Sequence, residues 1–315
     1  MGFIELWGKR WYNNSIKVRA RQIGICVKGN KVRIIDTSID FPSVYDAEQF
    51  NLDNWNNYID KWIPGAKELC LSDMRDCIDA GYSWSEDYLP VLNAVLTGKE
   101  KREEAVRAFY AVSEHLDEKI VEVFGKSVDA DIVLYLGLCN GAGWVTKIQE
   151  KITVLLGIEK IMELDWCNKN DMTGLIVHEL GHVFQGQYGS LSHNSNSMAE
   201  EFLWQLFTEG IAMVFEQEII GDAGYFHQNK NGWKEWCDRN LELIKHSFYC
   251  DLGEITQESQ RYFGDWVRFE VHPDVGYYLG THFVRYLLKS DCFENIINYT
   301  FEKVQTGFDR FMNSD

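Results

Sequence analysis

The sequence has few prolines, a deficit of basic residues and no long apolar run. Only 4 of its 315 residues are proline, while 45% are hydrophobic and 14% aromatic, which is enough to build a core and excludes wholesale disorder. The longest apolar run, Ile132 to Leu138, is too short to span a bilayer. Residues 1–17 contain no basic region followed by an apolar stretch, so no secretory signal is predicted. We therefore expect a cytoplasmic protein.

Acidic residues outnumber basic ones by 48 to 31, which gives a formal net charge of −17. Nucleic-acid affinity comes mainly from Lys and Arg, so nucleic acid is excluded as the expected partner. Anionic membrane surfaces are disfavoured for the same reason. The 8 cysteines contain no CxxC pair, and without a secretory signal they are expected to be reduced.

Hydrophobic patterning predicts an α+β fold that is mostly helical. Residues 16–39 are predicted to form a hairpin or small meander with a turn at Gly29-Asn30. Residues 44–125 are predicted to be mainly helical, most clearly over 99–124. Asp131–Gly137 and Ile152–Ile158 are short apolar runs bounded by glycine, which indicates buried strands of a small mixed sheet. The glycine-rich stretch 138–144 between them is expected to be a connection. From residue 172 the chain is again helical.

These patterns suggest three segments that together form one compact two-lobed unit. Residues 1–60 form a β-rich N-terminal segment, residues 61–128 a helical region, and residues 129–315 the domain that carries the chemistry. That chemistry is indicated by one motif in the third segment.

The motif is His178-Glu-Leu-Gly-His182. Residues four apart share one face of a helix, so both imidazoles can reach the same metal ion, and Glu179 projects beside them where it can polarise a metal-bound water. Asp171 or Thr173 is the expected N-cap of this helix, and Gly186 its expected end. Two histidines on an ordinary amphipathic helix are the alternative interpretation.

Catalytic zinc requires three protein ligands and one open position. We expect the third ligand to be Glu209, because a carboxylate within the apolar stretch Phe207–Val214 is costly unless it is paired or metal-bound. The small residues Gly210 and Ala212 would let this helix approach another closely. His193 is a weaker candidate for the third ligand, because it lies in a polar loop eleven residues after His182. The remaining glutamates of the segment, Glu200, Glu201 and Glu216, are expected to be solvated surface charges.

His178-Glu-Leu-Gly-His182, followed 27 residues later by Glu209-Gly-Ile-Ala212, resembles the gluzincin type of zinc metallopeptidase. The stretch from Leu134 to Gln185, together with residues 275–280, looks more particularly like a bacterial family of unknown function described as predicted zinc-dependent proteases. The likeness covers roughly residues 88–290. It implies a zincin-like domain, Zn²⁺ held by His178, His182 and Glu209, and Glu179 as general base.

The sequence departs from the gluzincin pattern at Met213, where an acidic residue is expected four positions after the ligand Glu. The carboxylate that orients a ligand histidine must then come from elsewhere. Asp165, Asp171, Glu201 and a backbone carbonyl remain open as candidates.

Peptide hydrolysis builds an oxyanion, and a donor near the metal would stabilise it. Tyr278 is the preferred donor, with Tyr277 and His282 as alternatives, although an aromatic helix packed in the core would look the same. The strand Ile152–Ile158 could bind extended substrate as an edge strand, or it could be a core strand that binds no ligand. His115, His227, His246 and His272 have no informative spacing and are expected to be ordinary surface or packing residues.

The sequence thus predicts a zinc metallopeptidase that acts on a peptide or protein substrate. A zinc-containing binding or regulatory protein without turnover is one alternative. Another metal-dependent amidase, with Cys139 or Cys167 as a ligand, is the other. Substrate identity and oligomeric state are not indicated by any motif.

Overall fold

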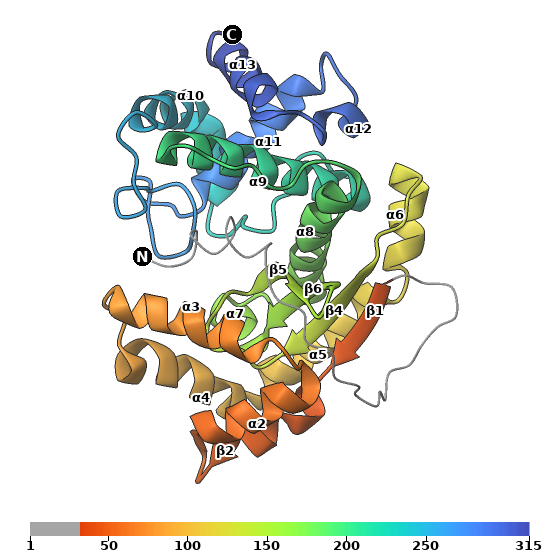
Figure 1. The fold of residues 1–315 in the computed structure, drawn as a ribbon, viewed down its shortest axis with the longest axis vertical. Coiled ribbons are helices and arrows are strands. Elements are labelled where there is room, and N and C mark those ends of the chain that lie inside the picture. Colours follow the sequence, from red (N-terminus) through yellow and green to blue (C-terminus); the bar gives the residue numbers. More distant parts are fainter. Residues whose placement is uncertain (1–31, 315) are drawn as a thin grey trace. The chain divides into compact units, whose positions relative to one another are not determined.

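The structure is a computed structural model that describes residues 32–314 (Figure 1). It is 59% helical, with a four-stranded mixed sheet and a separate two-stranded sheet. The expected α+β class is therefore correct. The predicted hairpin over residues 16–39 lies largely outside the described residues, which include only its last strand. No helix among the described residues is long and apolar enough to cross a membrane.

The chain divides into two compact units, one ending at Glu179 and the other starting at Leu180. The division falls inside one continuous helix, α8 (Lys169–Tyr188). Both predicted segment boundaries, at residues 60 and 128, fall within the first unit.

The first unit contains the main sheet, in the order β1-β4-β6-β5. β1 (Val32–Asp36), β4 (Ala130–Tyr135) and β6 (Lys151–Gly157) are parallel, whereas β5 (Gly143–Ile148) runs antiparallel to β6. β4 is buried along its whole length, including Asp131, whose carboxylate pairs with Arg33 of β1. The predicted strands at 131–137 and 152–158 are thus present as β4 and β6.

The prediction that Ile152–Ile158 is an edge strand is wrong. β6 is hydrogen-bonded to β4 on one side and to β5 on the other. Within the described residues the sheet ends at β5, whose first residues had been assigned to a glycine-rich connection. β5 is short and contains both Gly143 and Lys147, so it lacks the continuous apolar signal of a central strand.

Helices surround this sheet in the first unit. Trp55 on α2 donates its indole N–H to the carbonyl of Leu136 at 2.8 Å, which fixes the helix against the end of β4. The predicted helical stretch over 99–124 is divided near Glu114 into two helices. The remaining elements of the unit are η1 (Ser38–Val44), β2 (Tyr45–Asp46), β3 (Gln49–Phe50), α2 (Leu52–Trp62), α3 (Lys67–Asp79), η2 (Trp84–Tyr88), α4 (Leu89–Thr97), α5 (Lys99–Ser113), α6 (Leu116–Phe124) and α7 (Ile158–Glu163).

Helix α8 begins and ends outside its predicted limits. The side chain of Asn168 accepts hydrogen bonds from the backbone N–H groups of Asn170 and Asp171, so it caps the helix in place of Asp171 or Thr173. The helix continues through Gly186 to Tyr188. The predicted N-caps and the predicted stop were therefore wrong, while the helix itself is present.

The second unit is helical, with α9 (Met198–Ile220), α10 (Trp233–Asp251), α11 (Val275–Leu287), α12 (Phe293–Ile296) and α13 (Phe301–Met312). α9 is buried from Leu206 to Gln217 on all its faces. It packs closely on α11, because a Cβ atom at Gly210 would overlap the carbonyl group of Gly280. The expected close approach at Gly210 is thus correct.

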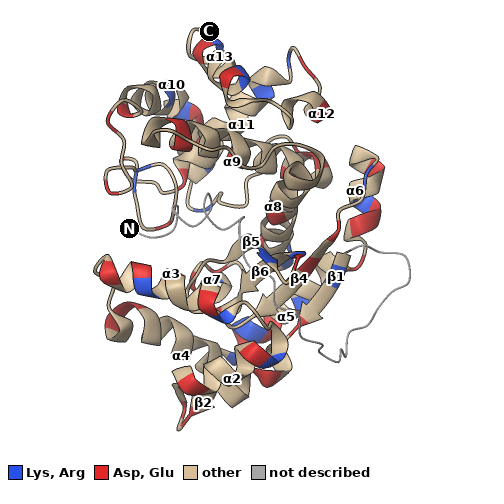
Figure 2. Ribbon diagram, in the orientation of Figure 1, with Lys and Arg blue, Asp and Glu red and all other residues tan. Residues whose placement is uncertain are grey.

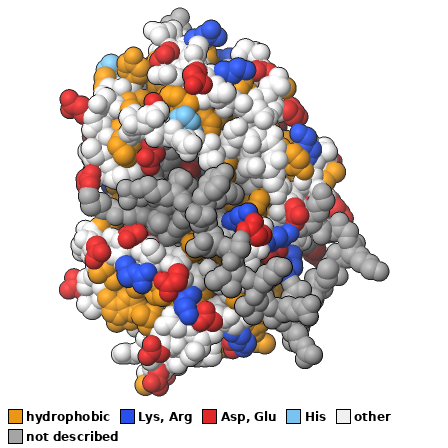
Figure 3. Space-filling view, in the orientation of Figure 1, with side chains coloured by type: hydrophobic (Ala, Val, Ile, Leu, Met, Phe, Trp, Pro, Cys, Tyr) orange, Lys and Arg blue, Asp and Glu red, His pale blue; other side chains and the backbone are white. Residues whose placement is uncertain are grey.

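Charged residues are distributed over the helices of both units (Figure 2). On the face shown in Figure 3, acidic side chains alternate with basic ones and do not gather in a single patch.

Candidate metal centre

The two histidines of the motif lie one turn apart on α8 and are both buried. His178 is 4% exposed and His182 is 1% exposed, and Glu179 between them is 5% exposed. Their neighbours Ile176, Val177 and Leu180 are fully buried, so the helix has no solvated face here. Polar side chains in such a setting require partners.

Glu209 lies on α9 next to the second histidine. Its Oε2 atom is 3.3 Å from Nε2 of His182, and the carboxylate is 5% exposed. Two small residues bring α8 and α9 together at this point, since a Cβ atom at Gly181 would lie only 2.8 Å from Cα of Ala212. The small-residue contact predicted for Ala212 is therefore present.

His178, His182 and Glu209 form one group that could hold a metal ion, with ligand atoms within 4.8 Å of one another. The spacing fits zinc. Two atoms that are each about 2.0–2.1 Å from a tetrahedral zinc ion are themselves about 3.3 Å apart, which is the distance between His182 and Glu209. The structure thus brings the three predicted ligands together, and their role as ligands stays a prediction.

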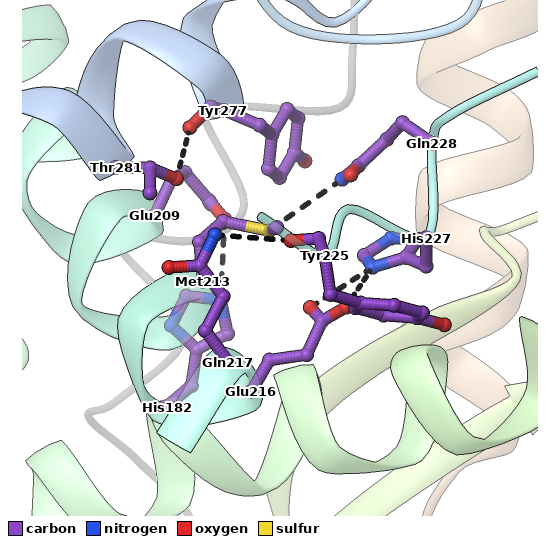
Figure 4. A network of polar contacts seen from close by, with 10 residues as sticks. All are labelled: His182, Glu209, Met213, Glu216, Gln217, Tyr225, His227, Gln228, Tyr277 and Thr281. Carbon is purple, nitrogen blue, oxygen red and sulfur yellow. Dashed lines mark hydrogen bonds and ion pairs between the residues drawn. The ribbon is translucent and has the colours of Figure 1, made fainter. Parts of the chain in front are cut away.

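A second buried pair, which the sequence patterns did not predict, includes a residue on the same face of α9. Glu216 is fully buried, contrary to the expectation of a solvated charge, and both its carboxylate oxygens lie close to Nδ1 of His227, at 3.1 and 3.0 Å (Figure 4). His227, expected to be an ordinary histidine, is 5% exposed. The signal in the sequence is one-sided, because Val214-Phe215 precede Glu216 but Gln217-Glu218 follow it, whereas Glu209 has apolar residues on both sides. With His178, this pair forms a second group that could hold a metal.

Glu200 and His193 lie at the surface, as expected. Glu200 accepts hydrogen bonds from the backbone and side-chain nitrogens of Asn196 and lies 3.5 Å from Nε2 of His193. The His193 ring stacks on Phe301 with centroids 4.7 Å apart. These contacts hold the loop before α9 and assign His193 a packing role.

The proposed orienting acids make contacts elsewhere. Asp165 forms an exposed ion pair with Lys101 at 2.6 Å, and Asp171 accepts a hydrogen bond from the side chain of Asn168. Glu201 accepts one from Gln257 at 3.5 Å. None of these three contacts involves the motif histidines.

Helix α11 presents two tyrosines differently. The hydroxyl of Tyr278 donates to Oδ1 of Asp238 on α10 at 2.7 Å. Burial, and to a smaller extent this hydrogen bond, raises the pKa of the phenol. His282 packs on the same ring, with centroids 4.4 Å apart, and burial lowers the pKa of its imidazole. Tyr277 is half-buried, and its backbone carbonyl accepts a hydrogen bond from the hydroxyl of Thr281 at 2.7 Å (Figure 4). The hydroxyl of Tyr278 is thus bound to Asp238, and the choice of oxyanion donor stays a prediction.

The start of β5 lies against the carboxylate of the motif glutamate. A Cβ atom at Gly143 would lie 2.7 Å from Oε1 of Glu179 and 2.8 Å from a methyl carbon of Leu175. Glycine at this position therefore lets the backbone of the terminal strand pass beside Glu179.

The glycine-rich connection before β5 is held by a buried acid. Glu159 accepts hydrogen bonds from the backbone N–H groups of Gly137 and Cys139 at 2.9 and 3.1 Å. Burial raises the pKa of the Cys139 thiol well above its usual value, which disfavours the thiolate that a metal ligand requires. Neither metal-capable group found among the described residues contains a cysteine.

Comparisons with known proteins returned no match, whether with family models, with curated proteins or with solved structures. The resemblance to the gluzincins stays a prediction. What the site can do chemically must be argued from its own residues.

Proposed function

We propose that this protein hydrolyses peptide bonds with the help of a zinc ion held by His178, His182 and Glu209. The observation that carries the proposal is the buried contact between His182 and Glu209, which are 3.3 Å apart. The helix of His182, α8, also carries His178 and Glu179. Two imidazoles and one carboxylate are a ligand set typical of catalytic zinc, which keeps one position open.

Each of the other site residues has a role in this proposal. Bound zinc would supply Lewis acidity and make water a nucleophile near neutral pH. The carboxylate of Glu179 would take a proton from the attacking water and pass it to the leaving amine nitrogen. A structural zinc site needs no such base and usually closes with a fourth protein ligand, so the presence of Glu179 supports catalysis over a purely structural metal.

The terminal strand β5 is the proposed binding surface for the substrate backbone. An extended peptide added to this strand would form main-chain hydrogen bonds with it, and Gly143 places the start of the strand beside Glu179. Tyr277 is the proposed donor to the oxyanion, because the hydroxyl of Tyr278 is bound to Asp238.

The test compares the wild type with Glu179→Gln for zinc content and for cleavage of a broad peptide library. The variant should keep its zinc and lose cleavage by at least about 100-fold, because only the proton acceptor is removed. Equal cleavage by the two proteins would refute the role of Glu179. A zinc-loaded wild type that cleaves no peptide would instead favour a binding or regulatory protein.

A further inference from the structure

The carboxylate that would orient a ligand histidine is absent from its expected position. The residue one turn after Glu209 is Met213, which is fully buried and whose sulfur accepts a hydrogen bond from Nε2 of Gln228 at 3.7 Å. A ligand imidazole normally donates its second ring N–H to an acceptor that fixes its tautomer and its orientation. Some other group must provide that acceptor.

Glu216 is two turns after Glu209 and lies on the same face of α9, because residues seven apart are nearly in line on a helix. Its carboxylate is 0% exposed, so its charge requires hydrogen-bond donors. One donor is Nδ1 of His227. An ionised carboxylate has about four acceptor positions, which leaves capacity for a further donor.

Three neighbouring contacts fix His227 over this face of α9 (Figure 4). Gln217 donates its side-chain amide to the carbonyl of Tyr225 at 3.0 Å, Glu216 binds His227, and Gln228 donates to Met213. The loop between α9 and α10 is thereby held by successive residues, so the Glu216 carboxylate has a defined position.

The group formed by His178, Glu216 and His227 has two chemically distinct interpretations. A ligand atom of His178 lies within 4.8 Å of those of both Glu216 and His227, so the three could bind a second ion. However, a neutral imidazole has only one nitrogen lone pair to offer a metal. If His178 uses it for the ion shared with His182 and Glu209, its other nitrogen carries the proton and suits an acceptor such as a carboxylate.

We propose that Glu216, braced by His227, is the positioning residue that orients His178 for metal binding. This inference rests on the proposed metal centre, but it concerns the geometry of the imidazole and not the reaction. Glu216, one turn after Met213 on the same helix, would thus take the role of the acid expected at position 213.

Zinc affinity tests the proposal, measured at pH 8 by competition with a chromophoric chelator. Glu216→Gln should bind zinc about 10–100-fold more weakly than the wild type. The matched control is Glu218→Gln on the same helix, where the carboxylate is 44% exposed and pairs with Arg285. This control should bind like the wild type. Unchanged affinity in Glu216→Gln would overturn the proposal, and so would a wild type that binds two zinc ions of which the variant loses one.

The ring tautomer of His178 in the metal-free protein gives a second readout, from its ¹⁵N shifts. The wild type should show one tautomer and Glu216→Gln a mixture. The same tautomer in both proteins would contradict the proposal even if no zinc binds, in which case the proposed function fails separately. If Glu216→Gln does not fold, Glu216→Asp keeps the charge, withdraws the carboxylate by one methylene, and should weaken zinc binding and mix the tautomers in the same direction.

Discussion

Burial separates the acidic residues that have particular partners from those that cover the surface. Glu159, Glu179, Glu209 and Glu216 are each no more than 5% exposed in a chain with 48 acidic residues. Placing a carboxylate in such surroundings is costly unless donors or a cation compensate it. Three of the four lie on α8 and α9 at the candidate centre, and Glu159 holds the loop before β5.

Glu159 should make stability depend on pH. Burial raises the pKa of its carboxyl from 4.5 to about 7, against the opposing effect of its backbone hydrogen bonds. When folding raises the pKa of a group, the group stabilises the protein fully at a pH below its unfolded-state pKa. This stabilisation is lost as the pH rises through the folded-state pKa. The wild type should therefore lose up to about 3 kcal/mol of unfolding free energy between pH 4.5 and pH 8, relative to Glu159→Gln.

Urea unfolding of the two proteins across this range measures the effect, and the difference between them removes the contribution of other titrating groups. Parallel pH curves would show that folding does not raise the pKa of Glu159.

At the same scale, the sequence predicted Glu209 but not Glu216. Glu209 was identified from its apolar neighbours on both sides. Glu216 is followed by Gln217 and Glu218, which suggested a polar face. Packing buries Glu216 and Gln217 but leaves Glu218 44% exposed, and the sequence of neighbours does not separate these cases.

At the scale of elements, the centre depends on how closely α8 and α9 approach. Gly181→Ala would place a methyl group 2.8 Å from the backbone of Ala212, so the helices must shift. We expect a loss of about 1–3 kcal/mol in stability and weaker zinc binding. The control is Gly186→Ala on the same helix, where the new methyl would meet Leu191 at an ordinary 3.5 Å. That change should stabilise the protein by up to about 1 kcal/mol.

Thermal unfolding and zinc titration of the two variants compare these effects directly. Similar behaviour of both would mean that the contact at Gly181 does not set the distance between the helices.

The elements predicted best were those with a strong local signal. β4 and β6 each contain a short continuous apolar run, and α8 and α9 carry long apolar stretches. β5 was missed because a short strand that begins with glycine and includes a lysine has a weak pattern. Strand order cannot be read from such patterns, since the neighbours of β6 depend on pairings with distant residues, and the edge assignment failed for that reason.

At the scale of the whole molecule, the net charge of −17 should influence which peptides are cleaved. A negative surface attracts cationic ligands over long range, and salt screens this attraction. Lys-rich peptides should be cleaved with a higher kcat/KM than matched Glu-rich peptides at low salt, with the difference shrinking several-fold at high salt. A preference that does not change with salt would show that the charge affects solubility alone.

The most direct test of the account is the zinc stoichiometry and affinity of the wild type beside Glu209→Gln, with Glu218→Gln as the matched control. The account predicts one tightly bound zinc ion in the wild type and the control. It predicts a large loss of affinity in Glu209→Gln, because an amide is a far weaker zinc ligand than a carboxylate. A Glu209→Gln protein that binds zinc as tightly as the wild type would contradict the proposed metal centre.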